Sequence, residues 1–210
     1  DNMAEPLSGV TAILTGKPLK ATGGVTRAPL GTPLPTDATT RLNAAFVPQG
    51  FISEDGVTRT TDASDDKIKA WGGQVVKVVR SDFSVSYKFS YMESASATTL
   101  KSIVGEENVT ITPPEAGKHD GKVAVKINAK PAPRASYTLE MLDENTFIRE
   151  VIPIGQISVS GDVKFTHSSV IQYEVTIEAL PDSTDNNAYE YLDTVPADKL
   201  AEVKKALGVN

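Results

Sequence analysis

The stretch from Phe83 to Met92 restricts the fold more than any other part of the chain. Large apolar side chains occupy its odd positions, and serines or a lysine occupy most of its even positions. A period of two is typical of a β-strand with one buried and one exposed face. Such a strand spans roughly 33 Å at ~3.3 Å per residue, whereas the usual strand has ~5–6 residues. The sequence therefore predicts a long, half-buried strand.

Other segments show the same alternation or a run of β-branched and aromatic residues between turn signals. Together they predict one acidic, mainly β domain, because helical spacing is rare between them. The expected strands lie at 23–29, 122–128, 137–141, 147–152, 157–165 and 170–179.

Two helices are expected beside these strands. The segment 94–104 has apolar residues at i, i+3 and i+4, and Gly105 is placed to cap its C-terminal end. Near the C-terminus, three apolar residues fall on one stripe of a short amphipathic helix between Pro196 and Gly208. This stripe (Leu200, Val203, Leu207) needs a groove, either on its own domain or on a neighbouring subunit.

The distribution of glycine, proline and charge divides the chain into three regions. Residues 1–50 carry six of the fifteen glycines and six of the thirteen prolines, which favours an arm or loops. Within them, residues 1–22 form an expected N-terminal arm, with a flexible tail as the alternative for residues 1–16. Residues 23–181 form the β domain, in which 47–66 is expected to be a long acidic surface loop. Residues 182–210 form an acidic connector followed by the terminal helix.

Composition excludes several classes of function. The net charge of −6 and the pI of about 5.0 argue against a basic surface that grips nucleic acid. The chain has no cysteine, so disulfides, thiol nucleophiles and cysteine zinc sites are excluded. No apolar run approaches the ~18 residues of a membrane span, so we expect no membrane insertion. We expect the protein to be synthesised in a cytoplasm.

No catalytic, cofactor-binding or metal-binding site is expected. The two histidines, His119 and His167, lack a second ligand nearby in the sequence and are interpreted as turn residues. The glycine pairs lack the spacing of a phosphate-binding loop, and no serine has the context of a nucleophile elbow. An enzyme is therefore disfavoured.

Three stretches in order resemble a known family. They are GKPLKATGGVTRAPLGTPLPTDATTRLNAAFVPQGFISEDGVT at 16–58, IKAWGGQVVKVVRSDFSVSYKFSYMES at 68–94 and ATTLKSIVGEENVT at 97–110. The chain resembles the major tail (tail tube) proteins of long-tailed bacteriophages, especially of phages that infect actinobacteria. The resemblance covers most of residues 16–180. The last thirty residues, including the terminal helix, are not placed within the family pattern.

The resemblance implies a fold, an assembly and a set of partners. It implies a β-sandwich or barrel-like tail tube subunit with one packed α-helix, long loops and an N-terminal arm. Six subunits would form a ring, and stacked rings would form a virion tail that conducts double-stranded DNA without binding a specific sequence or a cofactor. The other partners would be the tail initiator, the terminator and the tape-measure protein. A virion decoration or receptor-contacting β domain is the alternative.

Two sets of residues are candidates for the functional surfaces of such a subunit. The polar face of the strand at 170–179 could line the lumen, with an ordinary exposed outer face as the alternative; its residues are Gln172, Glu174, Thr176 and Glu178. The acidic loop and the segment after it have opposite net charges, which suits contact between rings or subunits but also neutralisation within one molecule. The candidates for this contact are Glu54, Asp55, Arg59, Asp62, Asp65, Asp66 and Trp71.

Overall fold

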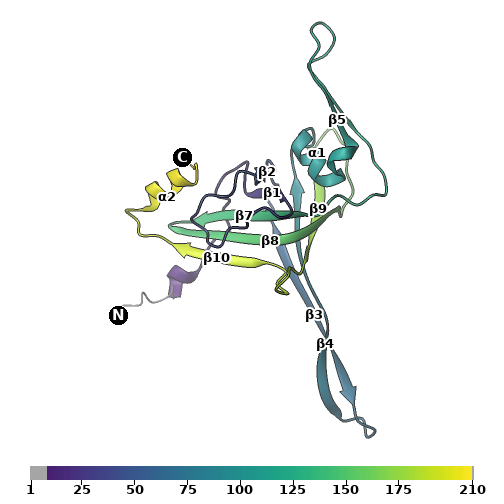
Figure 1. Cartoon of the computed structure of the whole chain (residues 1–210), viewed down its shortest axis with the longest axis vertical. Helices are drawn as coiled ribbons and strands as arrows, with labels where there is room; N and C mark the ends of the chain where they lie inside the picture. The colour runs from purple at the N-terminus through teal and green to yellow at the C-terminus, as the bar shows by residue number, and fades with distance from the viewer. Residues whose placement is uncertain (1–8, 210) are drawn as a thin grey trace.

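The computed structural model describes residues 9–209 and is mainly β (Figure 1). An eight-stranded antiparallel sheet has the order β2-β1-β7-β8-β9-β4-β3, and β10 pairs with β8 beside β9. A separate two-stranded sheet contains β5 and β6. The strands are β1 (Val25–Pro29), β2 (Val47–Pro48), β3 (Thr58–Lys69), β4 (Val75–Tyr91), β5 (Val109–Thr112), β6 (Lys122–Val125), β7 (Ala135–Asp143), β8 (Thr146–Val159), β9 (Tyr173–Leu180) and β10 (Tyr189–Thr194).

The helices are short and lie at the periphery of the sheet. A 3-10 helix, η1, spans Gly9–Ala12, α1 spans Ala97–Val104, a second 3-10 helix, η2, spans Glu106–Asn108, and α2 spans Leu200–Ala206. Helix α1 begins after Ser96, whose side chain accepts a hydrogen bond from the Thr99 amide, and it ends at Gly105 with a φ of 89°. The expected helix at 94–104 is thus confirmed, and it begins at Ala97, after the N-cap residue Ser96.

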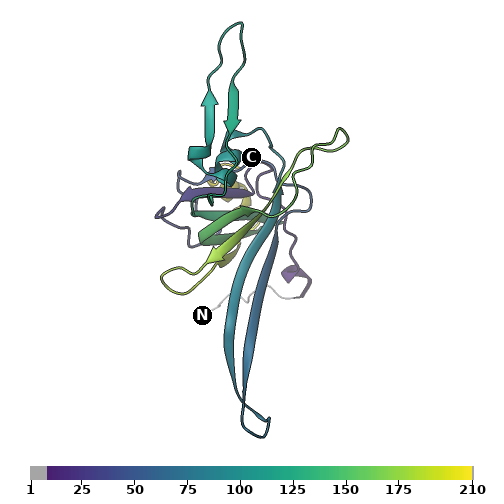
Figure 2. The same ribbon diagram turned by 90° about the vertical axis from the view of Figure 1, so that its right-hand side faces the viewer.

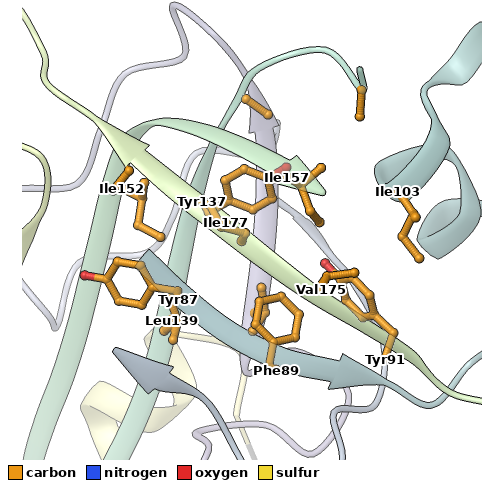
Figure 3. Packing of buried hydrophobic residues seen from close by; sticks show 14 of the residues in the cluster. Tyr87, Phe89, Tyr91, Ile103, Tyr137, Leu139, Ile152, Ile157, Val175 and Ile177 are labelled. Carbon is orange, nitrogen blue, oxygen red and sulfur yellow. The ribbon is translucent and has the colours of Figure 1, made fainter. Parts of the chain in front are cut away.

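The expected long strand is confirmed and is longer than predicted, because β4 extends back to Val75. Its C-terminal half supplies the main core. Val85, Tyr87, Phe89 and Tyr91 are buried against β7, β8, β9 and α1, and Figure 3 shows the three aromatic rings facing Ile177 and Val175 of β9. The alternation therefore gave the correct buried face from Val85 to Tyr91. Phe83, expected on the same face, is 47% exposed, because β9 pairs with β4 only from Val85 onward.

A second, smaller cluster packs the C-terminal helix and the segment around Leu19 against the sheet. Leu207, at the end of α2, packs with Leu19, Ala38 and Phe147. The C-terminal helix therefore docks on its own subunit, which decides between the two grooves considered from the sequence. Residues 1–8 of the expected arm lie outside the described residues, while Leu19 within it is buried.

Arg149 on β8 binds the proline-rich loop at 29–40 to the sheet. Its side chain is fully buried, and its Nη2 donates a hydrogen bond of 2.5 Å to Oε1 of Glu140. Its Nη1 donates a hydrogen bond of 2.7 Å to the backbone carbonyl of Asp37. A buried charge requires such partners, so the loop around Asp37 is held in one place.

Several expected boundaries were wrong. The expected loop 47–66 ends earlier, because β3 begins at Thr58 and its threonines pair with β4 without any apolar face to reveal them. The acidic connector contains strand β10 from Tyr189, which pairs with β8. The strands expected at 147–152 and 157–165 are one continuous strand, β8, which ends at Val159. The strand expected at 122–128 ends at Val125, and the strand expected at 170–179 begins at Tyr173.

Candidate assembly interface

The β3–β4 hairpin leaves the body of the subunit and projects beyond it (Figures 1 and 2). Strand β9 pairs with β4 only over Val85–Tyr91, so β4 from Val75 to Ser84 pairs with β3 alone. Strand β3 pairs only with β4. Within the described chain, the projecting part of the hairpin therefore has two edges without a strand partner. Unpaired edges of this kind are templates for strand addition by another chain.

The projecting part is a two-stranded antiparallel ribbon whose pairing register shifts along its length. Ala70 and Gly73 close its tip, where the Gly73 amide donates to the Ala70 carbonyl at 2.8 Å and Gly73 has a φ of 82°. A register shift between Ser64 and Asp65 leaves one extra residue on β4, which changes the face on which the following side chains lie. Asp65 and Arg80 are paired across the ribbon at 2.5 Å.

Large apolar side chains lie exposed on this ribbon. Val75, Val76, Val78 and Val79 are between 39% and 61% exposed, and the Trp71 side chain at the tip has no cover at all. The paired positions place Val78 on the face of Lys67 and Val79 on the face of Asp66, so both faces of the ribbon are partly apolar. An isolated two-stranded ribbon is marginally stable in water, and exposed apolar residues in a contiguous patch are typical of an interface.

The root of the hairpin is fixed by a network of charged and polar groups. The Arg59 guanidinium on β3 forms ion pairs with Glu150 of β8 and Glu190 of β10, the latter at 3.0 Å. The Tyr87 hydroxyl donates a hydrogen bond of 2.8 Å to Oε2 of Glu150. Burial raises the pKa of Glu150, and the Tyr87 hydrogen bond and the Arg59 charge oppose that shift. Burial likewise raises the pKa of Tyr87. The network connects the hairpin to two strands of the body.

The structure separates the candidate interface residues into three groups. Glu54 and Asp55 lie in a turn before β3, which is closed by a 3.0 Å hydrogen bond from the Gly56 amide to the Ser53 carbonyl. Arg59 belongs to the root network. Asp62, Asp65, Asp66 and Trp71 lie on the projecting hairpin. The acids are therefore not one cluster, and residues 9–209 contain no group of three or more carboxylates or histidines able to hold a metal ion.

The candidate lumen residues follow the polar face of β9. Glu174, Thr176 and Glu178 are half-exposed and alternate with the buried Val175 and Ile177. Gln172 lies just before the strand.

Neighbouring strands contribute polar side chains to the same face. Glu178 pairs in register with Ser86 of β4 and with Gln156 of β8. Glu174 forms an ion pair with Lys88 of β4 at 3.0 Å. The sequence analysis missed Lys88, because the pairing of β4 with β9 is a tertiary contact that no local pattern reveals.

The valines on the projecting hairpin were also missed as interface residues, although Trp71 at its tip was a candidate. Their signal is the run Val75–Val79, in which Lys77 alone interrupts four valines. A continuous apolar run is typical of a strand that is buried on both faces. In the described part of this subunit, no other element packs against the faces of the run.

The comparison with known proteins agrees with these features. A family model described as "Phage tail tube protein" matches residues 18–201, which is most of the chain. The chain belongs to the phage tail tube protein family. No curated protein sequence matches it significantly.

Membership has direct consequences for the tail tube protein. Its family is one of virion components that assemble with copies of themselves into a tube. The projecting, partly apolar hairpin with two free edges is a surface suited to such self-assembly. In the described part of the tail tube protein, no helix is long and apolar enough to cross a membrane.

Proposed function

We propose that this tail tube protein forms six-membered rings that stack into a tube and conduct double-stranded DNA from the capsid to the host. The observation that carries the proposal is the projecting half of the β3–β4 hairpin. Both of its edges lack a strand partner within the described residues, and valines lie exposed on both of its faces. A single subunit cannot cover these groups, whereas neighbours in a ring can.

Two kinds of contact follow from this proposal. Strand edges that close on neighbours within a ring remove unpaired N–H and C=O groups. Rings that stack head to tail use a heterologous interface, which does not close on itself and permits open-ended growth. The length of the tube must then be set by other proteins, for which the tail initiator, terminator and tape-measure protein are the expected partners. The tail tube protein would itself be structural and without catalytic activity.

We assign the lumen to the polar outer face of β9 and β4. Glu174, Thr176 and Glu178 share this side of the sheet with serines of β4, and Gln172 lies just before the strand. DNA carries one negative charge per ~1.7 Å of its axis, so a hydroxyl-rich face with few free cations would not hold it. Lys88 supports this assignment, because its ion pair with Glu174 neutralises the cation.

Electron microscopy of the purified full chain tests the assembly. We expect rings or tubes with sixfold symmetry at high protein concentration or after addition of the tail initiating complex. A protein that stays monomeric under both conditions would contradict the proposal and favour a decoration or receptor-contacting domain.

A double charge reversal tests the lumen. Phage that carry Glu174→Lys and Glu178→Lys should assemble tails, because these side chains lie outside the subunit core, but should eject DNA more slowly at low salt. The matched control reverses two exposed acids elsewhere, Glu144→Lys and Asp198→Lys. Normal ejection by the first variant at all salt concentrations would remove the lumen assignment.

A further inference from the structure

Trp71 is the most exposed large apolar side chain of the described chain, at 105% of its reference area. It lies at the tip of the β3–β4 hairpin, as far from the body as this hairpin extends (Figure 1). Tryptophan is among the largest apolar side chains and is enriched among the residues that dominate protein interfaces. A solvated tryptophan on a ribbon that points away from its own core therefore requires a binding site on another molecule.

The tip is also basic. Lys67 and Lys69 on β3 and Lys77 on β4 lie on the strand ends next to the tip, and none of the three forms an ion pair with another residue in the described range 9–209. The nearest ion pair on the ribbon joins Asp65 and Arg80. The receptor for the tip should therefore be an apolar cavity with an acidic rim.

The body contains one cavity of this kind. It has a volume of about 470 Å³ and lies between the N-terminal segment, the turn before β3, and strands β7 and β8. Its apolar wall includes Pro18, Val25, Ile52, Leu139 and Met141. A cavity of this size falls in the range of pockets that bury drug-sized ligands, and the thioether of a methionine makes favourable contacts with aromatic rings.

The rim of this cavity is acidic. Glu54 and Asp55 lie on it, and neither carboxylate forms an ion pair within the described chain. The two other acids of its lining, Glu140 and Glu150, are bound by Arg149 and Arg59. The free charge of the rim is therefore negative and opposite to that of the tip.

We propose that the Trp71 indole of one subunit occupies this cavity on a second copy of the chain, with Lys67 and Lys69 against Glu54 and Asp55. The proposal rests on the proposed tube assembly and identifies one of its contacts. The hairpin tip and the cavity that receives it, called the socket below, are different surfaces, so the contact is heterologous. Repeated contacts of this type extend a stack. The two surfaces are separate parts of one subunit, with the tip held away from the body that contains the socket (Figures 1 and 2).

The two other large cavities fit the tip less well. A cavity of about 340 Å³ beside α1 has in its lining Lys126, which forms no ion pair in the described chain and would repel the lysines of the tip. A cavity of about 500 Å³ lies between the hairpin root and β10, and its lining includes Asn186 and Asn187. The lining also includes an acid, Asp185, but more than half of its residues are polar or charged, so an indole would gain less apolar contact there than in the cavity beside Met141.

Truncation of the indole should weaken assembly strongly. Interface tryptophans of this type cost at least ~2 kcal/mol when truncated, which corresponds to a roughly 30-fold change in an equilibrium constant. We expect Trp71→Ala to raise the protein concentration needed for tube formation by about this factor, and Trp71→Phe to raise it less. Unchanged assembly of Trp71→Ala would contradict the proposal.

A charge exchange tests the rim. The pair Glu54→Lys and Asp55→Lys should raise the concentration needed for assembly, and adding Lys67→Glu and Lys69→Glu to the same chain should restore it in part. Failure of the second pair to rescue the first would show that these charges do not meet.

Site-specific cross-linking decides the contact, because the chain has no cysteine of its own. Ala70→Cys places a thiol beside Trp71, and Ala21→Cys places one at the rim of the proposed socket. The control pairs Ala70→Cys with Ile127→Cys, which is 91% exposed beside the cavity next to α1. A short bismaleimide applied to assembled tubes should join the first pair between subunits and leave the control pair unjoined, and Trp71→Ala should abolish the cross-link.

The outcomes separate the two proposals. Tubes in which Ala70→Cys joins Ile127→Cys, or neither partner, overturn the socket while the tube function stands. A wild-type chain that forms no ring or tube removes the tube function, and the socket with it.

Discussion

Val85 and Val78 lie on the same strand, but Val85 is 6% exposed and Val78 is 55% exposed. Val85 is in the part of β4 that pairs with β9, and its side chain packs in the main core. Val78 is in the projecting part, where β3 is the only neighbouring strand. The two valines have the same intrinsic preference for a strand, so the neighbouring element alone decides their burial. The root of the hairpin is thus part of a folded domain, whereas its projection has no strand partner or apolar cover within the described chain.

Removal of the projection should give the largest separation between the two regions. Ala63 and Phe83 face each other in register, so residues 64–82 can be replaced by Asn-Gly to close a two-residue hairpin turn. We expect the shortened subunit to unfold at nearly the wild-type temperature but to form no tubes. Calorimetry and electron microscopy check this. Tubes of normal appearance would show that the projection is not an assembly element.

Matched valine truncations should show the same contrast in single residues. Val85→Ala removes buried apolar area and should lower the free energy of unfolding of the subunit by about 1.5–3 kcal/mol. Val78→Ala should change it by less than about 0.5 kcal/mol, because its side chain is exposed in the free subunit. Urea unfolding measures both. Equal losses would mean that the projection packs against the body in solution.

Two glycines provide a third comparison. A Cβ on Gly155 of β8 would lie 2.7 Å from the Tyr137 ring and 2.8 Å from Ile177, so Gly155→Ala should destabilise the subunit by about 1–3 kcal/mol. A Cβ on Gly72 at the tip meets no atom within 4 Å, and Gly72→Ala should change stability by less than about 0.5 kcal/mol. Thermal unfolding of both variants checks the pair. A large loss with Gly72→Ala would indicate a constraint on the tip that the free subunit does not show.

The smallest expected effect is the pH dependence at the hairpin root. The folded pKa of Glu150 lies above its ordinary 4.5, because burial opposes its charge. The folded state therefore binds this proton more tightly than the unfolded chain. The resulting stabilisation is complete below pH 4.5 and is lost as the pH rises through the folded pKa.

Glu150→Gln removes this titration, and its amide oxygen can still accept the Tyr87 hydrogen bond. The wild-type free energy of unfolding minus that of the variant should therefore decrease as the pH rises from 4.5. Urea unfolding over a pH series measures the difference. An increase with pH would mean that the ion pair with Arg59 outweighs the burial of Glu150.

The sequence by itself determined the elements whose signal is local. The alternation gave the core face of β4 from Val85 to Tyr91. The spacing of Leu100 and Ile103 with Gly105 gave helix α1, and the short motifs gave the family. Each of these depends on side chains close together in the chain, so periodicity or spacing is enough to predict it.

Only the tertiary structure decided where the long strand leaves the body. The start of β3, the pairing of β10 with β8 and the ion pair between Lys88 and Glu174 join residues far apart in the sequence. The exposure of Val75–Val79 also depends on the point at which β9 stops pairing with β4. Burial is a property of neighbours in space, and an apolar run has the same sequence whether its partner is in the same subunit or in the next one.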